Sequence, residues 1–271
     1  MRRYITALSI AGSDSSGGAG IQADIKTMSA IGVYGMTAIT AITVQNTIGV
    51  TGVQGINPDI VAGQIDAVYG DIRPNAVKIG MLFSAETVEA VADALIRNNA
   101  RNIVLDPVMV STSGSKLMDD EAIDTVKSRL LPLSTLVTPN VEEAKVLTGT
   151  DNSEEQIRAL REFGATAILL KGGDSSNPSQ SVDILSASTA STTVLLASDR
   201  VHTVNTHGTG CTLSSAIASY LALGYPLEKA VLKGKSYIDQ ALKSGADIST
   251  GHGHGPVNHM FAPVPYTIIE S

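Results

Sequence analysis

The feature that most constrains the fold is the regular alternation of short apolar segments with longer amphipathic ones. The apolar segments predict strands, and they are Ile5–Ala11, Thr37–Val44, Ala76–Ile79, Asn102–Leu105, Thr135–Thr138 and Ala167–Lys171. The intervening segments have the apolar spacing of helices, and they are Ile21–Ile31, Asp59–Tyr69, Ala85–Asn98, Asp119–Leu130, Glu142–Leu147 and Glu154–Phe163. Strands that are apolar throughout are typical of parallel sheets buried on both faces. This alternation, sustained over about 170 residues, predicts a three-layer α/β/α fold with a mostly parallel central sheet.

The pattern changes between Ser181 and Thr203. Three short apolar segments follow one another there without a helix, and they are Val182–Leu185, Thr192–Leu196 and Arg200–Val204. We expect them to form an antiparallel meander at one edge of the sheet. Two helices are expected after it, Cys211–Leu223 and Leu227–Ser244. No segment is long and polar enough to be a linker, so we expect a single domain over residues 1–271.

Composition excludes several classes of partner. The chain is 43% hydrophobic and 17% charged, as expected of a packed globular protein. Its net charge is −7, and no cluster of Lys and Arg exceeds the pair Arg2-Arg3, so we expect no nucleic-acid partner. We find no apolar stretch long enough for a membrane helix and no signal-peptide pattern, so we also expect no membrane partner. A single cysteine fits a reducing compartment, and the expected location is the cytoplasm.

That cysteine, Cys211, lies in T-H-G-T-G-C, where a glycine-rich turn leads into an apolar helix. Backbone N–H groups at such a helix start point outward and, with the helix dipole, favour a bound anion. The same position favours a thiolate, so we expect a lowered pKa for the thiol. The segment could therefore supply an anion cradle together with a base or nucleophile. On the local sequence alone, a buried thiol with only a packing role is the more common explanation.

Polar residues follow several of the predicted strands. Ligands of open α/β sheets bind beyond the carboxyl ends of the strands. A Gly/Ser loop, Ala11–Gly20, follows the first strand, and the other groups at strand ends are Gln45, Asp106, Asn140 with Glu143, and Lys171. Each could be ordinary turn chemistry. Together with the Gly-Thr-Gly-Cys turn they offer oxygen ligands for Mg²⁺, a cation for phosphates and N–H groups for a transferring group, which is what phosphoryl transfer needs.

The same motifs, in the same order, resemble those of the ribokinase-like vitamin kinases. They are A-G-S-D-S-S-G-G-A-G-I-Q-A-D, D-P-V-M, T-P-N-x-x-E, L-K-G-G, T-H-G-T-G-C and a terminal G-H-G-P-V-N-H. Among these enzymes, the chain is most similar to the hydroxymethylpyrimidine and phosphomethylpyrimidine kinases of thiamin biosynthesis. The resemblance extends from about Ile5 to His259.

The resemblance implies roles for the residues of the motifs. Cys211 would be the base that takes the proton of the substrate hydroxymethyl group, with the Gly208 and Gly210 backbone holding the developing charge. Asp106 and Glu143 would bind Mg²⁺. The residues implied for ATP and its phosphates are Lys171, Thr206, Thr209 and Asn140. Those implied for the substrate pocket are Gln45, Gly12, Asp24, Met81 and Val108; Asp24 could instead be a solvated helix residue.

The resemblance also implies an activity and its partners. It implies that ATP phosphorylates 4-amino-5-hydroxymethyl-2-methylpyrimidine and then its monophosphate, in a homodimer. Since the chain has a single Gly-Thr-Gly-Cys turn, we expect one site to perform both steps. The Gln45 amide can pair with an exocyclic amine and the adjacent ring nitrogen. The main alternative is a pyridoxal or pyridoxine kinase of the same fold. Two further alternatives are a hydrolase using Cys211 with His207 and a non-catalytic pyrimidine-binding protein.

Three further histidines are spaced like metal ligands near the C-terminal end, namely His252, His254 and His259. No carboxylate or cysteine neighbours them in the sequence, so we give a metal site there little weight. His207, beside the glycine turn, could orient the turn or contact phosphate.

Overall fold

The central element is an eight-stranded sheet of order β11-β10-β9-β8-β7-β6-β2-β3. The computed structural model describes residues 1–109, 118–174, 179–187 and 193–270. The strands of this sheet are β2 (Thr6–Ala11), β3 (Tyr34–Ile39), β6 (Ala76–Ile79), β7 (Ile103–Leu105), β8 (Leu136–Val137), β9 (Ile168–Asp174), β10 (Gln180–Ser186) and β11 (Val194–Asp199). All pairs from β3 to β9 are parallel, whereas β10 pairs antiparallel with both β9 and β11. The predicted parallel sheet with an antiparallel edge is confirmed.

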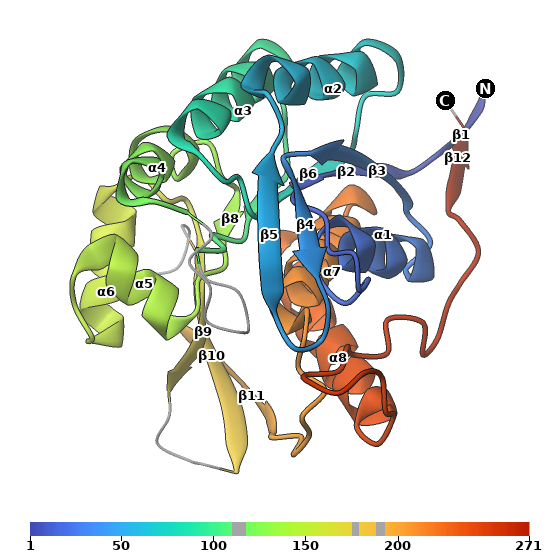
Figure 1. Cartoon of the computed structure of the whole chain (residues 1–271), viewed down its shortest axis with the longest axis vertical. Coiled ribbons are helices and arrows are strands. Elements are labelled where there is room, and N and C mark those ends of the chain that lie inside the picture. The colour runs from blue at the N-terminus through green and yellow to red at the C-terminus, as the bar shows by residue number, and fades with distance from the viewer. Residues whose placement is uncertain (110–117, 175–178, 188–192, 271) are drawn as a thin grey trace.

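Helices cover both faces of this sheet (Figure 1). One face packs on α2 (Pro58–Asp71), α3 (Ala85–Arg97), α4 (Asp120–Thr125), α5 (Val141–Thr148) and α6 (Ser153–Glu162). The other packs on α1 (Gly20–Ala30), α7 (Thr209–Ala222) and α8 (Leu227–Gly245). Successive strand residues point to opposite faces, so Leu8 and Ile10 enter the first core and Ala7 the second. Both faces are therefore buried, which explains why these strands are apolar throughout.

Capping residues set where several helices begin. Asn57, Ser84, Asp119, Asn140 and Asn152 each accept a hydrogen bond from a backbone N–H in the first turn that follows. Such a bond satisfies an N–H that has no partner inside the helix. The segment expected as one helix over Asp119–Leu130 changes form along its length. Its first part is α4, and it continues as a π-helix, η1 (Val126–Leu130).

The strand expected at Thr37–Val44 is two strands. The chain leaves the main sheet at Thr40, where the Thr40 hydroxyl donates to the Met81 carbonyl at 2.6 Å. Beyond it, β4 (Ala41–Gln45) pairs antiparallel with β5 (Val50–Gly55) in a separate two-stranded sheet. Burial alternates along β4, and Ile42 and Val44 are exposed. The β-branched and apolar segment Thr37–Val44 therefore spans parts of two strands. The first belongs to the central sheet, and the second is buried on one face only.

Two other differences concern the ends of the meander and of the chain. The segment Arg200–Val204, expected as a strand, is irregular. It is held by side-chain hydrogen bonds instead of backbone pairing with a neighbouring strand, and one of them runs from the Thr203 hydroxyl to the Ala246 carbonyl at 2.8 Å. Thr192, the first residue of another expected strand, lies outside the described residues. Two short strands were not predicted, β1 (Arg2–Tyr4) and β12 (Ile268–Glu270). They pair antiparallel and bring the two ends together (Figure 1).

Candidate active site

A cleft of about 660 Å³ opens at the carboxyl edge of the parallel strands. Its walls come from the loops after β2, β6, β7 and β8, from β9, from β4 of the two-stranded sheet, and from the start of α7. Of the residues that the sequence predicted, those that line it are Gly12, Gln45, Met81, Asp106, Val108, Asn140, Glu143, Lys171, Gly208, Thr209, Gly210 and Cys211. Thr206 and Asp24 are not among the lining residues. The cleft thus brings together most of the expected site.

The glycine turn before α7 forms one wall of the cleft. Gly208 is the N-cap of α7 and has a φ of 81°, in the left-handed region that favours glycine. A Cβ on Gly208 would also overlap the carbonyl oxygen of Gly18. Cys211 is the third residue of the helix, so it lies in the first turn, where outward N–H groups and the dipole favour an anion. The expected anion cradle is therefore present, with the helix starting at Thr209 rather than Cys211.

The Cys211 side chain is partly exposed to this cleft. Burial raises the pKa of the thiol to about 11, and Lys78 is the main group acting in the opposite direction. Asp24 and Asp106 raise the pKa further, while an N–H bond from Gly20, at the start of α1, lowers it. The expectation of a lowered pKa is therefore wrong, because desolvation outweighs the helix start. In the ligand-free cleft the sulfur is a thiol at neutral pH.

A lysine between two carboxylates lies next to the glycine turn. Lys171 Nζ is 2.8 Å from Asp106 Oδ1 and 3.8 Å from Glu143 Oε2. Burial opposes the charge on Lys171, but these two carboxylates raise its pKa above the ordinary value. Burial also works to raise the pKa of Asp106, yet Lys171 and Lys78 hold it below its usual range. The pKa of Glu143 is raised by burial despite Lys171. Asp106 is therefore the preferred partner of the lysine.

Asn140 and Glu143 form a reciprocal capping box at the start of α5. The Glu143 N–H donates to Asn140 Oδ1, and the Asn140 N–H donates to Glu143 Oε2, each at 2.8 Å. The spacing T-P-N-x-x-E thus has a structural explanation, a capping box, in addition to the expected binding role. It also fixes both side chains at the cleft, so a structural and a binding role are compatible.

Lys78 is a buried cation at the cleft that sequence reasoning missed. It extends from β6, and its Nζ is 2.9 Å from Asp24 Oδ2 with both side chains fully buried. Asp24 also accepts hydrogen bonds of 2.6 Å from Ser9 and from Ser215. Both ideas about Asp24 are thus wrong: it neither lines the pocket nor is solvated, but neutralises Lys78. A lysine in the middle of the apolar segment Ala76–Ile79 was the available signal.

Asp14 organises the loop between β2 and α1. Its carboxylate accepts N–H bonds from Ser16 at 2.8 Å, Gly18 at 3.0 Å and Ala19 at 2.8 Å. His207 Nε2 lies 2.8 Å from Asp14 Oδ2. Burial alone would raise the pKa of Asp14, but the bonds from His207, Ser16 and Ala19 outweigh it and hold the pKa well below its usual range. Asp14 therefore stays ionised and joins this loop to the turn before α7.

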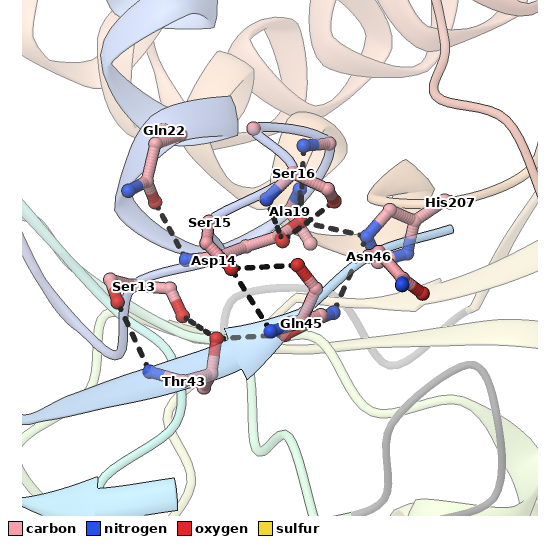
Figure 2. A network of polar contacts seen from close by, with 12 residues as sticks. Ser13, Asp14, Ser15, Ser16, Ala19, Gln22, Thr43, Gln45, Asn46 and His207 are labelled. Atoms are coloured by element: carbon pink, nitrogen blue, oxygen red, sulfur yellow. Dashed lines mark hydrogen bonds and ion pairs between the residues drawn. The ribbon is translucent and has the colours of Figure 1, made fainter. Parts of the chain in front are cut away.

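Gln45 ends β4 and projects toward this loop (Figure 2). Its backbone is tied to Ser15, whose hydroxyl accepts from the Gln45 N–H at 2.9 Å and donates to the Gln45 carbonyl at 2.6 Å. Its side-chain amide lies 3.1 Å from Thr43 Oγ1 and 3.4 Å from His207 Nε2. Gln45 thus belongs to the two-stranded sheet, not to the main sheet as the sequence suggested, and still reaches the cleft.

The described residues contain no group of three or more His, Cys, Asp or Glu side chains placed to hold a metal ion. In the tail, His252 and His254 are exposed, whereas His259 is buried and burial lowers its pKa to about 4.

The Asp106 and Glu143 carboxylates offer oxygen ligands at the cleft. Mg²⁺ in proteins is usually held by one or two carboxylates together with substrate phosphates, so these residues fit that ion.

Within the part of the chain that the structure describes, no helix has both the length and the apolar character needed to cross a membrane.

Comparison with known proteins agrees with this site. A family model described as phosphomethylpyrimidine kinase matches residues 14–258. A hydroxymethylpyrimidine/phosphomethylpyrimidine kinase of Rhizobium meliloti is 49% identical, over 93% of this chain and 96% of that protein. The thiamine biosynthesis bifunctional protein ThiED of Geobacter sulfurreducens is also 49% identical, over 94% of this chain. That protein is longer, and the match covers 52% of its length.

Two solved structures extend the comparison. Phosphomethylpyrimidine kinase of Clostridium difficile is 45% identical with a TM-score of 0.76, covering 88% of this chain and 99% of that one. A pyridoxal kinase of Bacillus subtilis, in an ADP complex, is 34% identical with a TM-score of 0.85, covering 95% and 98%. The fold and cleft thus define a ribokinase-like vitamin kinase, a phosphotransferase. Within that class, the chain belongs to the phosphomethylpyrimidine kinase family.

Proposed function

We propose that this chain transfers the γ-phosphoryl group of ATP to 4-amino-5-hydroxymethyl-2-methylpyrimidine and then to the resulting monophosphate, for thiamin biosynthesis. The observation that carries the proposal is that Gln45, Cys211 and Lys171 line the same cleft. Gln45 can read an aminopyrimidine edge, Cys211 stands at the anion cradle, and Lys171 supplies a cation for phosphates. One cleft holds all three, so a single site performs both steps.

Cys211 is proposed as the base that accepts the hydroxymethyl proton. A raised pKa makes the thiolate scarce in the ligand-free cleft, so the role depends on nearby positive charge. Lys78 supplies part of it, and the carboxylate of Asp106 opposes it. Asp106 already pairs with Lys171, and a dication added beside this pair would bring further positive charge near the sulfur and lower the pKa of the thiol. The N–H groups of Gly210 and its neighbours would hold the charge that develops on the transferring group.

Lys171, Asp106 and Glu143 are proposed to manage the phosphates. Mg²⁺ bound with ATP would supply the charge that neutralises phosphate oxygens, and Asp106 and Glu143 are the residues that would hold it. Lys171 would then turn from Asp106 to a phosphate oxygen. This movement would be short, because Gly210 of the glycine turn lies next to Lys171 and Asp106: a Cβ on Gly210 would be 3.3 Å from Lys171 Nζ and 3.5 Å from Asp106 Oδ2. Asn140, Thr209 and Thr206 are proposed to assist; Thr206 would do so through its turn, since it does not line the cleft.

Other parts of the proposal concern the chain as a whole. Residues 1–271 are proposed to be one domain, acting in the cytoplasm as a homodimer. Sedimentation velocity of the purified chain measures the oligomeric state.

Pyridoxal kinase activity is the second candidate, because solved pyridoxal kinases have higher TM-scores to this chain, up to 0.85, than the 0.76 of the phosphomethylpyrimidine kinase. Sequence identity favours the pyrimidine, with 45% against 34%. A hydrolase with a Cys211–His207 pair has less support, since His207 Nε2 faces Asp14.

The deciding experiment measures ADP release with the aminopyrimidine alcohol and with pyridoxal, and follows the pyrimidine products by phosphorus NMR. We expect a higher kcat/KM for the pyrimidine, and monophosphate followed by diphosphate. A higher kcat/KM for pyridoxal would favour the second candidate. Accumulation of monophosphate without diphosphate would contradict the two-step assignment, and no ATP consumption with either compound would favour a binding protein.

A further inference from the structure

The polar network beside Gln45 determines which way its side-chain amide points (Figure 2). The terminal oxygen and nitrogen of a glutamine occupy equivalent places, so hydrogen-bond partners decide which is which. As drawn in Figure 2, Gln45 Oε1 lies 3.1 Å from Thr43 Oγ1 and Gln45 Nε2 lies 3.4 Å from His207 Nε2, and exchanging the two atoms leaves both distances unchanged in kind. The partners of Thr43 and His207 therefore settle the orientation.

His207 Nε2 carries a hydrogen. It lies 2.8 Å from Asp14 Oδ2, and Asp14 accepts four further bonds from Ser16, Gly18 and Ala19. An ionised carboxylate only accepts, so Nε2 is the donor in this contact. A second donor facing the same Nε2–H would be repelled. The end of the Gln45 amide near His207 is therefore better occupied by the oxygen.

Thr43 gives the same answer from the other end. Its hydroxyl has one hydrogen, and the Ser13 carbonyl oxygen accepts it at 2.8 Å, nearer than the Gln45 amide at 3.1 Å. With that hydrogen used, Thr43 Oγ1 faces Gln45 as an acceptor. The end of the amide near Thr43 is therefore better occupied by the nitrogen.

The position of His207 is itself tightly fixed. A Cβ on Gly18 would overlap His207 Cδ2 and would lie 3.3 Å from Pro256, so the ring packs directly against the backbone of Gly18. The His207 N–H donates to the Gly255 carbonyl at 3.0 Å. The ring is buried, with 5% of the residue exposed. A ring held this way presents its Nε2–H in one direction only.

We propose that His207, held by Asp14, is a specificity-determining positioning residue that, with Thr43, locks the Gln45 amide with its oxygen toward His207 and its nitrogen toward Thr43. The remaining oxygen lone pair and N–H then offer the cleft an acceptor beside a donor, in fixed order. A 4-aminopyrimidine presents the complementary donor and acceptor, whereas its 4-oxo analogue presents the reverse. The choice of probe rests on the proposed function.

The kinetic test compares kcat/KM for the 4-amino alcohol with that for its 4-oxo analogue in wild type, His207→Leu and His207→Gln. Without the lock the amide can turn to match either edge. We expect the preference for the amino compound to fall by about ten- to a hundredfold in His207→Leu, the usual consequence of one unsatisfied buried donor or acceptor. His207→Gln keeps an N–H donor and should retain more of the preference. An equal loss for both substrates would show a merely structural role.

Thr43 supplies an independent pair, because a variant of His207 could fail to fold. Thr43→Val removes the acceptor for the amide, and Thr43→Ser retains it. The preference should fall in Thr43→Val and persist in Thr43→Ser. An unchanged preference in Thr43→Val and in a folded His207→Leu overturns the proposal.

Orientation can also be measured without any substrate. In the ligand-free protein, NOE cross-peaks from the Gln45 side-chain NH₂ should reach the Thr43 methyl group. Cross-peaks to the His207 ring alone would overturn the proposed lock even if the kinase activity is as proposed. If no pyrimidine is phosphorylated but the Thr43 cross-peaks are present, the proposed function fails and the lock stands.

Discussion

The two sides of the cleft are built from different interactions. In one part of the lining, charged residues project from parallel strands into a buried cluster: Lys78 pairs with Asp24, and Lys171 with Asp106. In another part of the lining, Gln45 is held mostly by neutral hydrogen bonds, on a two-stranded sheet outside the central one. We call these the charge side and the amide side.

The difference corresponds to two tasks. Charges on strands of the central sheet keep their positions whatever the substrate, and the Lys171–Asp106 pair lines the cleft, where a phosphate or Mg²⁺ can replace one partner. Amide and hydroxyl groups cost little to rearrange, but their donors and acceptors distinguish one ring edge from another. We therefore expect changes on the charge side to affect all substrates or the fold, and changes on the amide side to affect one substrate class.

The largest effect is expected for Cys211→Ala. A general base contributes about 10²–10⁴-fold, so phosphorylation of the alcohol should fall by that factor while ATP binding persists. The monophosphate acceptor is already ionised near neutral pH, since its second pKa is about 6, and it should lose less. Single-turnover rates with each acceptor measure the two losses. Near wild-type turnover would leave Cys211 with only a packing role.

Lys78→Met should damage the fold more than any other change on the charge side. It leaves the buried Asp24 carboxylate unpaired, at a cost of about 3–5 kcal/mol in the free energy of unfolding. Urea unfolding measures this loss. Lys243→Met, on the exposed surface of α8, is the matched control and should be nearly neutral. A loss in Lys78→Met no larger than in the control would mean that the ion pair contributes nothing.

On the amide side, Gln45→Met should raise KM for the pyrimidine by about ten- to a hundredfold. The amine donor and the ring-nitrogen acceptor of the substrate would be left without their partner on the protein. KM for pyridoxal should change little. Gln54→Met, an exposed position on β5, makes the same substitution without reaching the cleft. Equal effects of Gln45→Met on both substrates would make Gln45 a residue of the fold, and the contrast between the two sides would disappear.

Most of the charge side was predictable from the sequence. Asp106, Asn140 and Lys171 follow or end apolar segments, and parallel strands bring their carboxyl ends to one edge. Burial and pairing were not predictable: Asp24 was expected in the substrate pocket or, alternatively, as a solvated helix residue, because its partner, Lys78, is distant in sequence. The thiol pKa also depends on burial, which the local motif T-H-G-T-G-C does not record.

The amide side was less predictable. Thr37–Val44 looked like one strand, and only the bonds of Thr40 with the neighbouring loops reveal where the chain leaves the central sheet. Asp14 and His207 are 193 residues apart in sequence, so no local pattern suggested their contact. Gln45 was identified as a polar group at a strand end, but its place in the substrate pocket was implied only by the resemblance.

The raised pKa of Cys211 predicts a slow thiol in the ligand-free protein. Only the thiolate reacts, so alkylation by iodoacetamide should keep rising with pH up to about 11, beyond the range of an ordinary cysteine. Near pH 8 the rate should be roughly tenfold below that of a free thiol, because scarcity of thiolate is partly offset by its greater nucleophilicity. A plateau below pH 8.5 would contradict the dominance of burial.

The smallest effect is expected at Asn140, where variants can distinguish a role as the N-cap of α5 from a role in binding phosphates. Asn140→Ala removes the N-cap of α5 and should cost about 1 kcal/mol of stability, as should the control Asn152→Ala at α6, which does not line the cleft. Asn140→Ser keeps a capping oxygen, so it should restore stability. If Asn140 also serves the phosphates, Asn140→Ser will still lower kcat, whereas Asn152→Ala will not. Full recovery of both stability and kcat in Asn140→Ser would reduce Asn140 to a cap and confine the phosphate chemistry to the charged residues.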